Sequence, residues 1–125
     1  PLDISAKKDL TIGLMNLISA EEHSLYSYIN TRNNKYLDIL LKLRKIRQQV
    51  LESMVESEEG TEKYCLSKHL LSSSMRLFET GTKYLQEGTS QELGLSYLRQ
   101  GKDLQDLFLA LNCRDKSGVS TCYGG

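Results

Sequence analysis

The sequence has 125 residues, of which 39% are hydrophobic and 26% are charged, and 16 basic residues balance 16 acidic ones. This length suits a single domain that buries roughly two thirds of its unfolded surface and needs no disulfide or metal to fold. A net charge of zero lacks the basic excess of a broad nucleic-acid-binding surface, so we do not expect nucleic acid as a partner.

Two further properties bear on location. No apolar run approaches the roughly 20 residues of a membrane span, so we expect no membrane partner. The opening segment, PLDISAKKDL, lacks the apolar region of a secretory signal. We therefore expect a cytoplasmic protein.

Apolar residues recur at three- and four-residue steps along most of the chain, which is the periodicity of amphipathic helices. The pattern predicts helices over residues 5–31, 34–57, 62–87 and 90–112. Short connections make successive helices antiparallel. We therefore expect an all-α, up-down-up-down antiparallel four-helix bundle over residues 1–112, with residues 113–125 as a C-terminal tail.

Charged residues interrupt the apolar faces of the first two predicted helices. Glu21 lies at the centre of the first face, Arg47 lies within the second, and Arg44 lies at the edge of the second. Because an unpaired charge is costly to bury, we expect Glu21 to pair with Arg47 or Arg44 in the bundle interior. The alternatives are a polar pocket in which Arg44 and Arg47 bind a small anion, and side chains that extend out to solvent.

A cysteine and a histidine lie one helical turn apart near the start of the third predicted helix. Cys65 and His69 could bind one Zn²⁺ if Cys113 and Cys122 supplied the other two ligands. A hairpin of the third and fourth helices would bring residue 65 level with about residue 112, close to Cys113. A disulfide among the three cysteines, or three free thiols, would explain the same residues.

Small residues recur every seven positions on the third and fourth predicted helices. Seven residues make about two turns, so each set follows one line along its helix. Glycine inside a helix costs about 1 kcal/mol relative to alanine. We expect a close approach of the two helices to offset this cost. The residues are Ser67, Ser74, Gly81 and Gly88 on the third helix, and Gly94 and Gly101 on the fourth.

The fourth predicted helix carries a second apolar line, formed by Leu95, Leu98 and Leu109, on the side away from Leu104. Surplus apolar surface on a small bundle is typical of a partner-binding face, although a wide core stripe would give the same pattern. We therefore expect a protein that interacts with other proteins, most simply as a homodimer.

The alternative is a helical module that binds a metal or a small ligand, through the cysteine and histidine residues or through the two arginines. An enzyme ranks third, because the sequence contains no recognised catalytic motif. Apart from zinc, we expect no cofactor.

Overall fold

The computed structural model describes residues 2–112, and this part of the chain folds into four helices. The predicted all-α fold is confirmed, and every helix boundary lies within two residues of its predicted position. No helix in residues 2–112 is both long enough and apolar enough to cross a membrane. The helices are α1 (Ile4–Thr31), α2 (Asn34–Val55), α3 (Glu62–Glu87) and α4 (Gln91–Asn112).

Local polar groups define where the helices begin and end. Each helix is preceded by a side chain that accepts a hydrogen bond from a backbone N–H of the first turn, and these residues are Asp3, Asn33, Thr61 and Ser90. Gly88 ends α3 in the left-handed conformation, with φ of 69°. The helix α2 ends two residues earlier than predicted because Glu56 adopts the left-handed conformation, with φ of 54°.

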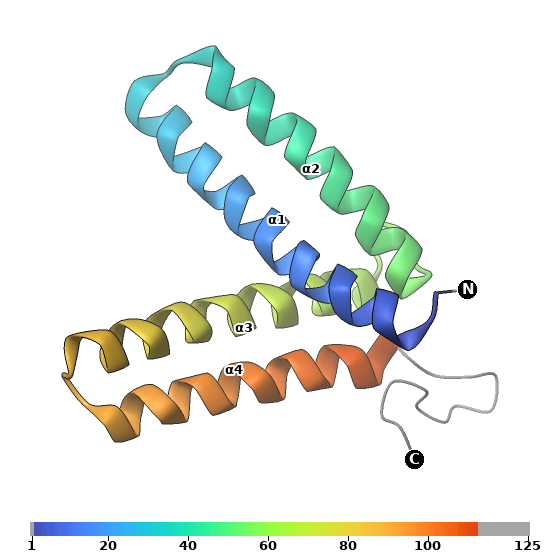
Figure 1. Cartoon of the computed structure of the whole chain (residues 1–125). Helices are drawn as coiled ribbons and strands as arrows, with labels where there is room; N and C mark the ends of the chain where they lie inside the picture. The colour runs from blue at the N-terminus through green and yellow to red at the C-terminus, as the bar shows by residue number, and fades with distance from the viewer. Residues whose placement is uncertain (1, 113–125) are drawn as a thin grey trace.

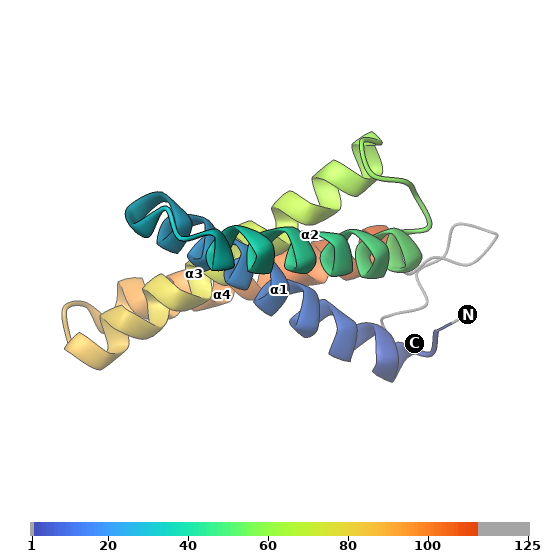
Figure 2. The ribbon, with the colours of Figure 1, turned by 90° about the horizontal axis from the view of Figure 1, so that it is seen from above.

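The four helices form two antiparallel hairpins that share one end (Figure 1). The start of α1, the end of α2, the start of α3 and the end of α4 come together there, and the two hairpin turns point apart. Seen from above, the α1–α2 hairpin crosses over the α3–α4 hairpin (Figure 2). The hairpins therefore pack as a four-helix bundle at the shared end and diverge beyond it.

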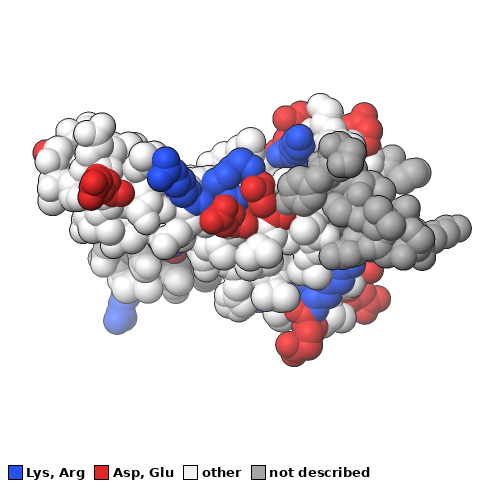
Figure 3. Space-filling view, turned by 90° about the horizontal axis from the view of Figure 1, so that it is seen from below, with Lys and Arg blue, Asp and Glu red and all other residues white. Residues whose placement is uncertain are grey.

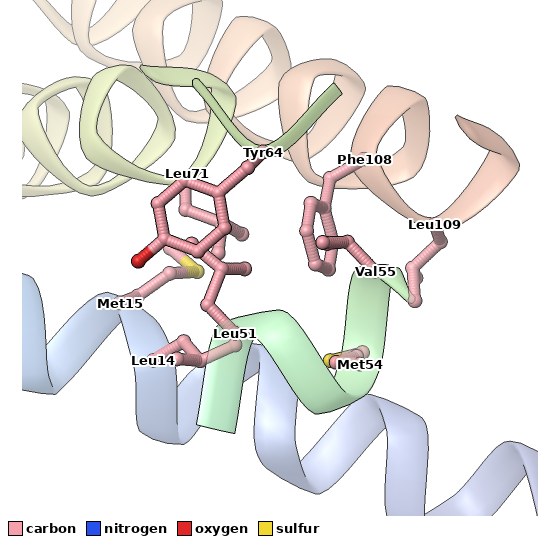
Figure 4. Packing of buried hydrophobic residues seen from close by; sticks show 9 residues of the cluster. All are labelled: Leu14, Met15, Leu51, Met54, Val55, Tyr64, Leu71, Phe108 and Leu109. Carbon is pink, nitrogen blue, oxygen red and sulfur yellow. The ribbon is translucent and has the colours of Figure 1, made fainter. Parts of the chain in front are cut away.

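The hydrophobic core lies at this shared end. Side chains of α1 and α2 meet those of α3 and α4 in a single cluster (Figure 4). In the described chain, no large hydrophobic residue is fully buried between residues 16 and 50 or between 72 and 107. The diverging halves of both hairpins thus keep apolar side chains in contact with solvent. The core residues are Leu14, Met15, Leu51, Met54, Val55, Tyr64, Leu71, Phe108 and Leu109.

The small residues bring α3 and α4 into close contact, as the seven-residue spacing predicts. Ser74 donates a hydrogen bond from Oγ to the carbonyl oxygen of Gly101 at 2.6 Å. A Cβ atom on Gly81 would lie 2.7 Å from the carbonyl oxygen of Gly94, and one on Gly101 would lie 2.7 Å from the ring of Phe78. Larger side chains at these positions would force the two helices apart.

This geometry gives two alanine substitutions opposite effects. Gly81→Ala should destabilise the protein by about 1–3 kcal/mol, because the new methyl group overlaps backbone that cannot move aside. Gly13→Ala, inside α1 with no atom within 4 Å of the new Cβ, should instead stabilise by up to about 1 kcal/mol through helix propensity. Urea denaturation of both variants measures the difference. Equal stabilisation by the two substitutions would mean that α3 and α4 are not in close contact.

Candidate functional site

Arg47 joins three helices through its guanidinium group, just beyond the hydrophobic core. Its Nε and Nη2 atoms donate to the two carboxylate oxygens of Glu21 on α1, each at 2.9 Å. Its Nη1 atom donates to the hydroxyl oxygen of Tyr64 on α3 at 2.7 Å. Arg47 is only 1% exposed and Glu21 is 9% exposed. The network therefore ties α1, α2 and α3 together where the two hairpins meet.

The protonation of this network follows from its surroundings. Burial by itself lowers the pKa of Arg47, but the hydrogen bonds to Glu21 and Tyr64 outweigh burial and raise it, so the guanidinium stays charged. Burial raises the pKa of the Tyr64 hydroxyl, and the charge of Arg47 opposes this only in part. Tyr64 is therefore a neutral phenol at physiological pH, and the ion pair of Glu21 and Arg47 is electrically balanced.

Arg44 lies apart from this network. Its side chain is 53% exposed, and its Nη2 atom lies 3.6 Å from a carboxylate oxygen of Glu59. The structure thus pairs Glu21 with Arg47 and not with Arg44. It also removes the basis for an anion pocket formed by both arginines, because Arg47 is buried and already hydrogen-bonded to Glu21 and Tyr64.

A cleft of about 570 Å³ lies beside the buried network, between the α1–α2 hairpin and α3. Its walls are mainly apolar and come from the halves of α1 and α2 that diverge from the other hairpin. Leu25, Tyr26 and Leu41 are 40%, 52% and 54% exposed there. The lining residues are Ile18, Glu21, Glu22, Leu25, Tyr26, Leu40, Leu41, Arg44 and Lys68.

The predicted zinc ligands can be placed only in part. Cys65 is a free thiol that packs partly buried against the hydrophobic core, whereas His69, one turn later on α3, is exposed. Cys113 and Cys122 lie outside the described residues. Within residues 2–112, no three His, Cys, Asp or Glu side chains are grouped so that they could hold a metal ion.

The predicted apolar line on α4 is not a continuous exposed surface. Leu109 is only 4% exposed and belongs to the core, so its assignment to an interface is wrong. Leu98 packs over Gly81, since a Cβ atom added to Gly81 would lie 2.8 Å from Leu98 Cγ. Of the three leucines, only Leu95 is exposed, at 40%. The sequence pattern failed for Leu109 because the two hairpins converge at their shared end, where Leu109 joins side chains of α1, α2 and α3 in the core.

The exposed apolar surface of the α3–α4 hairpin lies instead on the face turned away from α1 and α2. Leu66, Leu93 and Leu107 are 52%, 40% and 55% exposed. Leu66, Leu70 and Leu77 fall within about 40° of one another around α3, and Leu93, Leu104, Leu107 and Leu111 fall within about 60° around α4. We call this surface the outer face.

None of the outer-face residues named below is charged, and the nearest charged side chains are at its borders: Lys63 continues the line of Leu70 toward the start of α3, and Asp103 lies about 20° from Ser96 on α4. Its remaining members are serine, tyrosine and glutamine, and Tyr84 and Tyr97 contact each other edge to face across the two helices, with ring centroids 5.7 Å apart. The view from below shows charged side chains gathered in a row, with wide uncharged surface beside them (Figure 3). The outer face comprises Leu66, Leu70, Ser73, Leu77 and Tyr84 of α3 and Leu93, Ser96, Tyr97, Gln100, Leu104, Leu107 and Leu111 of α4.

Three features of these surfaces were not predicted from the sequence: the Tyr64 hydrogen bond, Lys68 in the cleft, and the outer face itself. The apolar periodicity of its helix predicts that Tyr64 is buried, and a buried tyrosine hydroxyl generally needs a hydrogen-bond partner, but the pattern does not identify that partner as Arg47. A helical wheel of residues 62–112 shows the uncharged outer face, so that signal was present in the sequence.

The chain matches no protein-family model, no curated protein and no solved structure. Its function must therefore be inferred from the surfaces themselves.

The buried ion pair should be far more important for stability than its exposed neighbour. Glu21→Gln leaves the Arg47 charge buried without a counter-charge, and should cost about 3–5 kcal/mol. Glu22→Gln, at the adjacent position, breaks a partly exposed pair with Arg76 and should cost at most about 1 kcal/mol. Chemical denaturation of the two variants gives the comparison, and similar small losses would show that Glu21 is solvated.

Tyr64→Phe should cost about 1–3 kcal/mol, because it leaves one donor of the buried Arg47 without an acceptor. Replacing all three polar partners together, with Glu21→Leu, Arg47→Met and Tyr64→Phe, removes every unsatisfied group. The triple variant should therefore be more stable than Glu21→Gln alone. Thermal unfolding followed by circular dichroism tests this order, and a triple variant less stable than the single one would contradict it.

Proposed function

We propose that this protein is a helical interaction module that self-associates through the outer face of the α3–α4 hairpin. The observation that carries the proposal is the uncharged, leucine-rich surface in which Leu66, Leu93 and Leu107 are each at least 40% exposed. Contiguous apolar surface of this kind on a small domain favours burial against another protein.

Electrical neutrality favours a second copy of the chain as the partner. In a two-fold dimer the same surface faces itself, so any charged group near the axis would lie close to an identical charge. The middle of the outer face has no such group among the described residues, because Lys63 and Asp103 lie at its borders. Two copies of the hairpin could therefore stack face to face without electrostatic repulsion, and each leucine would contribute twice.

Burial of apolar side chains would supply the free energy for association. Burying one fully exposed leucine contributes about 1.5–3 kcal/mol, and a leucine that is already half-buried contributes proportionally less. Three exposed leucines from each of two copies, with four partly buried ones beside them, give several kcal/mol to set against the loss of translational and rotational freedom. Tyr84 and Tyr97 add large side chains that are also typical of interface cores.

The proposal predicts that Leu107→Glu converts a dimer into a monomer, because the dimer would have to bury the new carboxylate without a partner. Leu95→Glu is the matched control: Leu95 is also exposed on α4, but it lies about 120° around the helix from Leu107. Leu95→Glu should leave the dimer intact. Sedimentation equilibrium over a range of concentrations measures both.

Two results would count against this assignment. An unmodified protein that stays monomeric at high micromolar concentration would show that the outer face does not mediate self-association. A protein that is dissociated by Leu95→Glu and not by Leu107→Glu would place the interface on the charged side of α4.

A further inference from the structure

The cleft between the hairpins contains a lysine whose amine makes no hydrogen bond or ion pair with any described residue. Lys68 is partly buried on α3 and lines the cleft beside the Glu21–Arg47 pair. Among the described residues, no acceptor lies within hydrogen-bonding distance of its amine. Burial, followed by the nearby charge of Arg47, lowers the pKa of Lys68, and the carboxylates of Glu21 and Glu59 oppose this only in part. A bound anion would offset both effects.

The two carboxylates in the cleft are already engaged elsewhere. Both oxygens of Glu21 accept hydrogen bonds from Arg47, and Glu22 accepts one from Arg76 at 2.9 Å. The charges in the cleft that lack a close partner are therefore positive: Lys68 at the inner wall, and Arg44, which has only a 3.6 Å contact with Glu59. A ligand should bring negative charge, and a singly charged group suits this position because Glu21 and Glu22 would repel a dianion.

The other residues that line the cleft are mainly apolar, so a ligand should also have an apolar part. Ile18, Leu25 and Tyr26 come from α1, and Leu40 and Leu41 come from α2. The two hairpins diverge along this part of α1 and α2 (Figure 1), and Leu25, Tyr26 and Leu41 remain exposed in the cleft. The volume of about 570 Å³ lies within the range of roughly 300–1,000 Å³ of small-molecule sites.

We propose that this cleft binds a small amphipathic carboxylate, with its apolar chain against α1 and α2 and its carboxylate paired with Lys68. Arg44, at the exposed edge of the cleft, adds a weaker attraction. The site is separate from the outer face, which lies on the opposite side of the α3–α4 hairpin. It does not depend on self-association.

The test is a calorimetric titration of the full chain with n-decanoate, and with decyltrimethylammonium as a cationic probe of the same chain length. Both probes are kept below their micelle-forming concentrations. Decanoate should bind with one site per chain and the ammonium probe should bind at least about tenfold more weakly, as expected for the gain or loss of one partly buried charge pair. Binding of decanoate should perturb NMR signals of Leu25 and Leu41 and leave those of Leu107 unchanged.

Three variants complete the test. Lys68→Gln should weaken decanoate binding by about tenfold, and Arg44→Gln by a smaller factor. Lys83→Gln, an exposed lysine on α3 outside the cleft, is the matched control and should have no effect. The titration is also repeated with the Leu107→Glu variant, which alters the outer face and not the cleft. Decanoate should bind this variant with unchanged affinity, whether or not the protein self-associates.

Absence of decanoate binding, equal affinity for the two probes, or an unchanged affinity in Lys68→Gln would each overturn the assignment. Because Lys68 is only partly buried and makes no hydrogen bond or ion pair with residues 2–112, Lys68→Gln should fold normally, and its circular dichroism spectrum verifies this.

Discussion

Arg47, on α2, contacts two of the other three helices that meet at the junction of the two hairpins. One buried guanidinium donates to both oxygens of Glu21 and to the hydroxyl of Tyr64, so a single side chain fixes α1, α2 and α3 relative to one another. Pairing and hydrogen bonding make this burial tolerable, because an isolated charge would be far too costly. The planar, bidentate hydrogen bonds between Arg47 and Glu21 also fix the relative orientation of α1 and α2, which apolar contacts alone do not impose.

The hydrophobic core and the ion pair together explain why the hairpins diverge. Every fully buried large apolar residue of the described chain lies near the shared end, and the Glu21–Arg47–Tyr64 network lies just beyond that core. Past this point α3 presents polar residues such as Glu79, Thr82 and Gln86 where further apolar contacts would be needed to continue the packing. Packing the hairpins together along this part would gain too little apolar burial to offset the desolvation of these polar residues. The apolar side chains of α1 and α2 therefore stay exposed in the cleft.

Divergence gives a small protein two distinct surfaces. The inner side becomes a cleft with apolar walls and a lysine that has no ion-pair partner among the described residues, whereas the outer face of α3 and α4 is rich in leucine and its named residues carry no charge. The close contact of α3 and α4 through Ser74, Gly81 and Gly101 keeps that hairpin a thin two-helix layer. In a layer of two helices, the other hairpin can cover only one side. Apolar side chains on the opposite side of α3 and α4 therefore stay exposed to solvent.

The sequence by itself determined the features that depend on neighbours within one helix or across one turn. Periodicity fixed the four helices, polar residues such as Ser90 fixed their starts, and the seven-residue spacing of small residues fixed the contact of α3 with α4. The expected pairing of Glu21 with Arg47 or Arg44 also followed from their positions on the apolar faces of two adjacent helices. Only the tertiary structure decided that Leu109 is core, that Tyr64 completes the network, and that Lys68 and the outer face stay uncovered. These outcomes depend on the crossing of two hairpins, which is set by the summed packing of residues far apart in the chain and is not encoded in any local pattern.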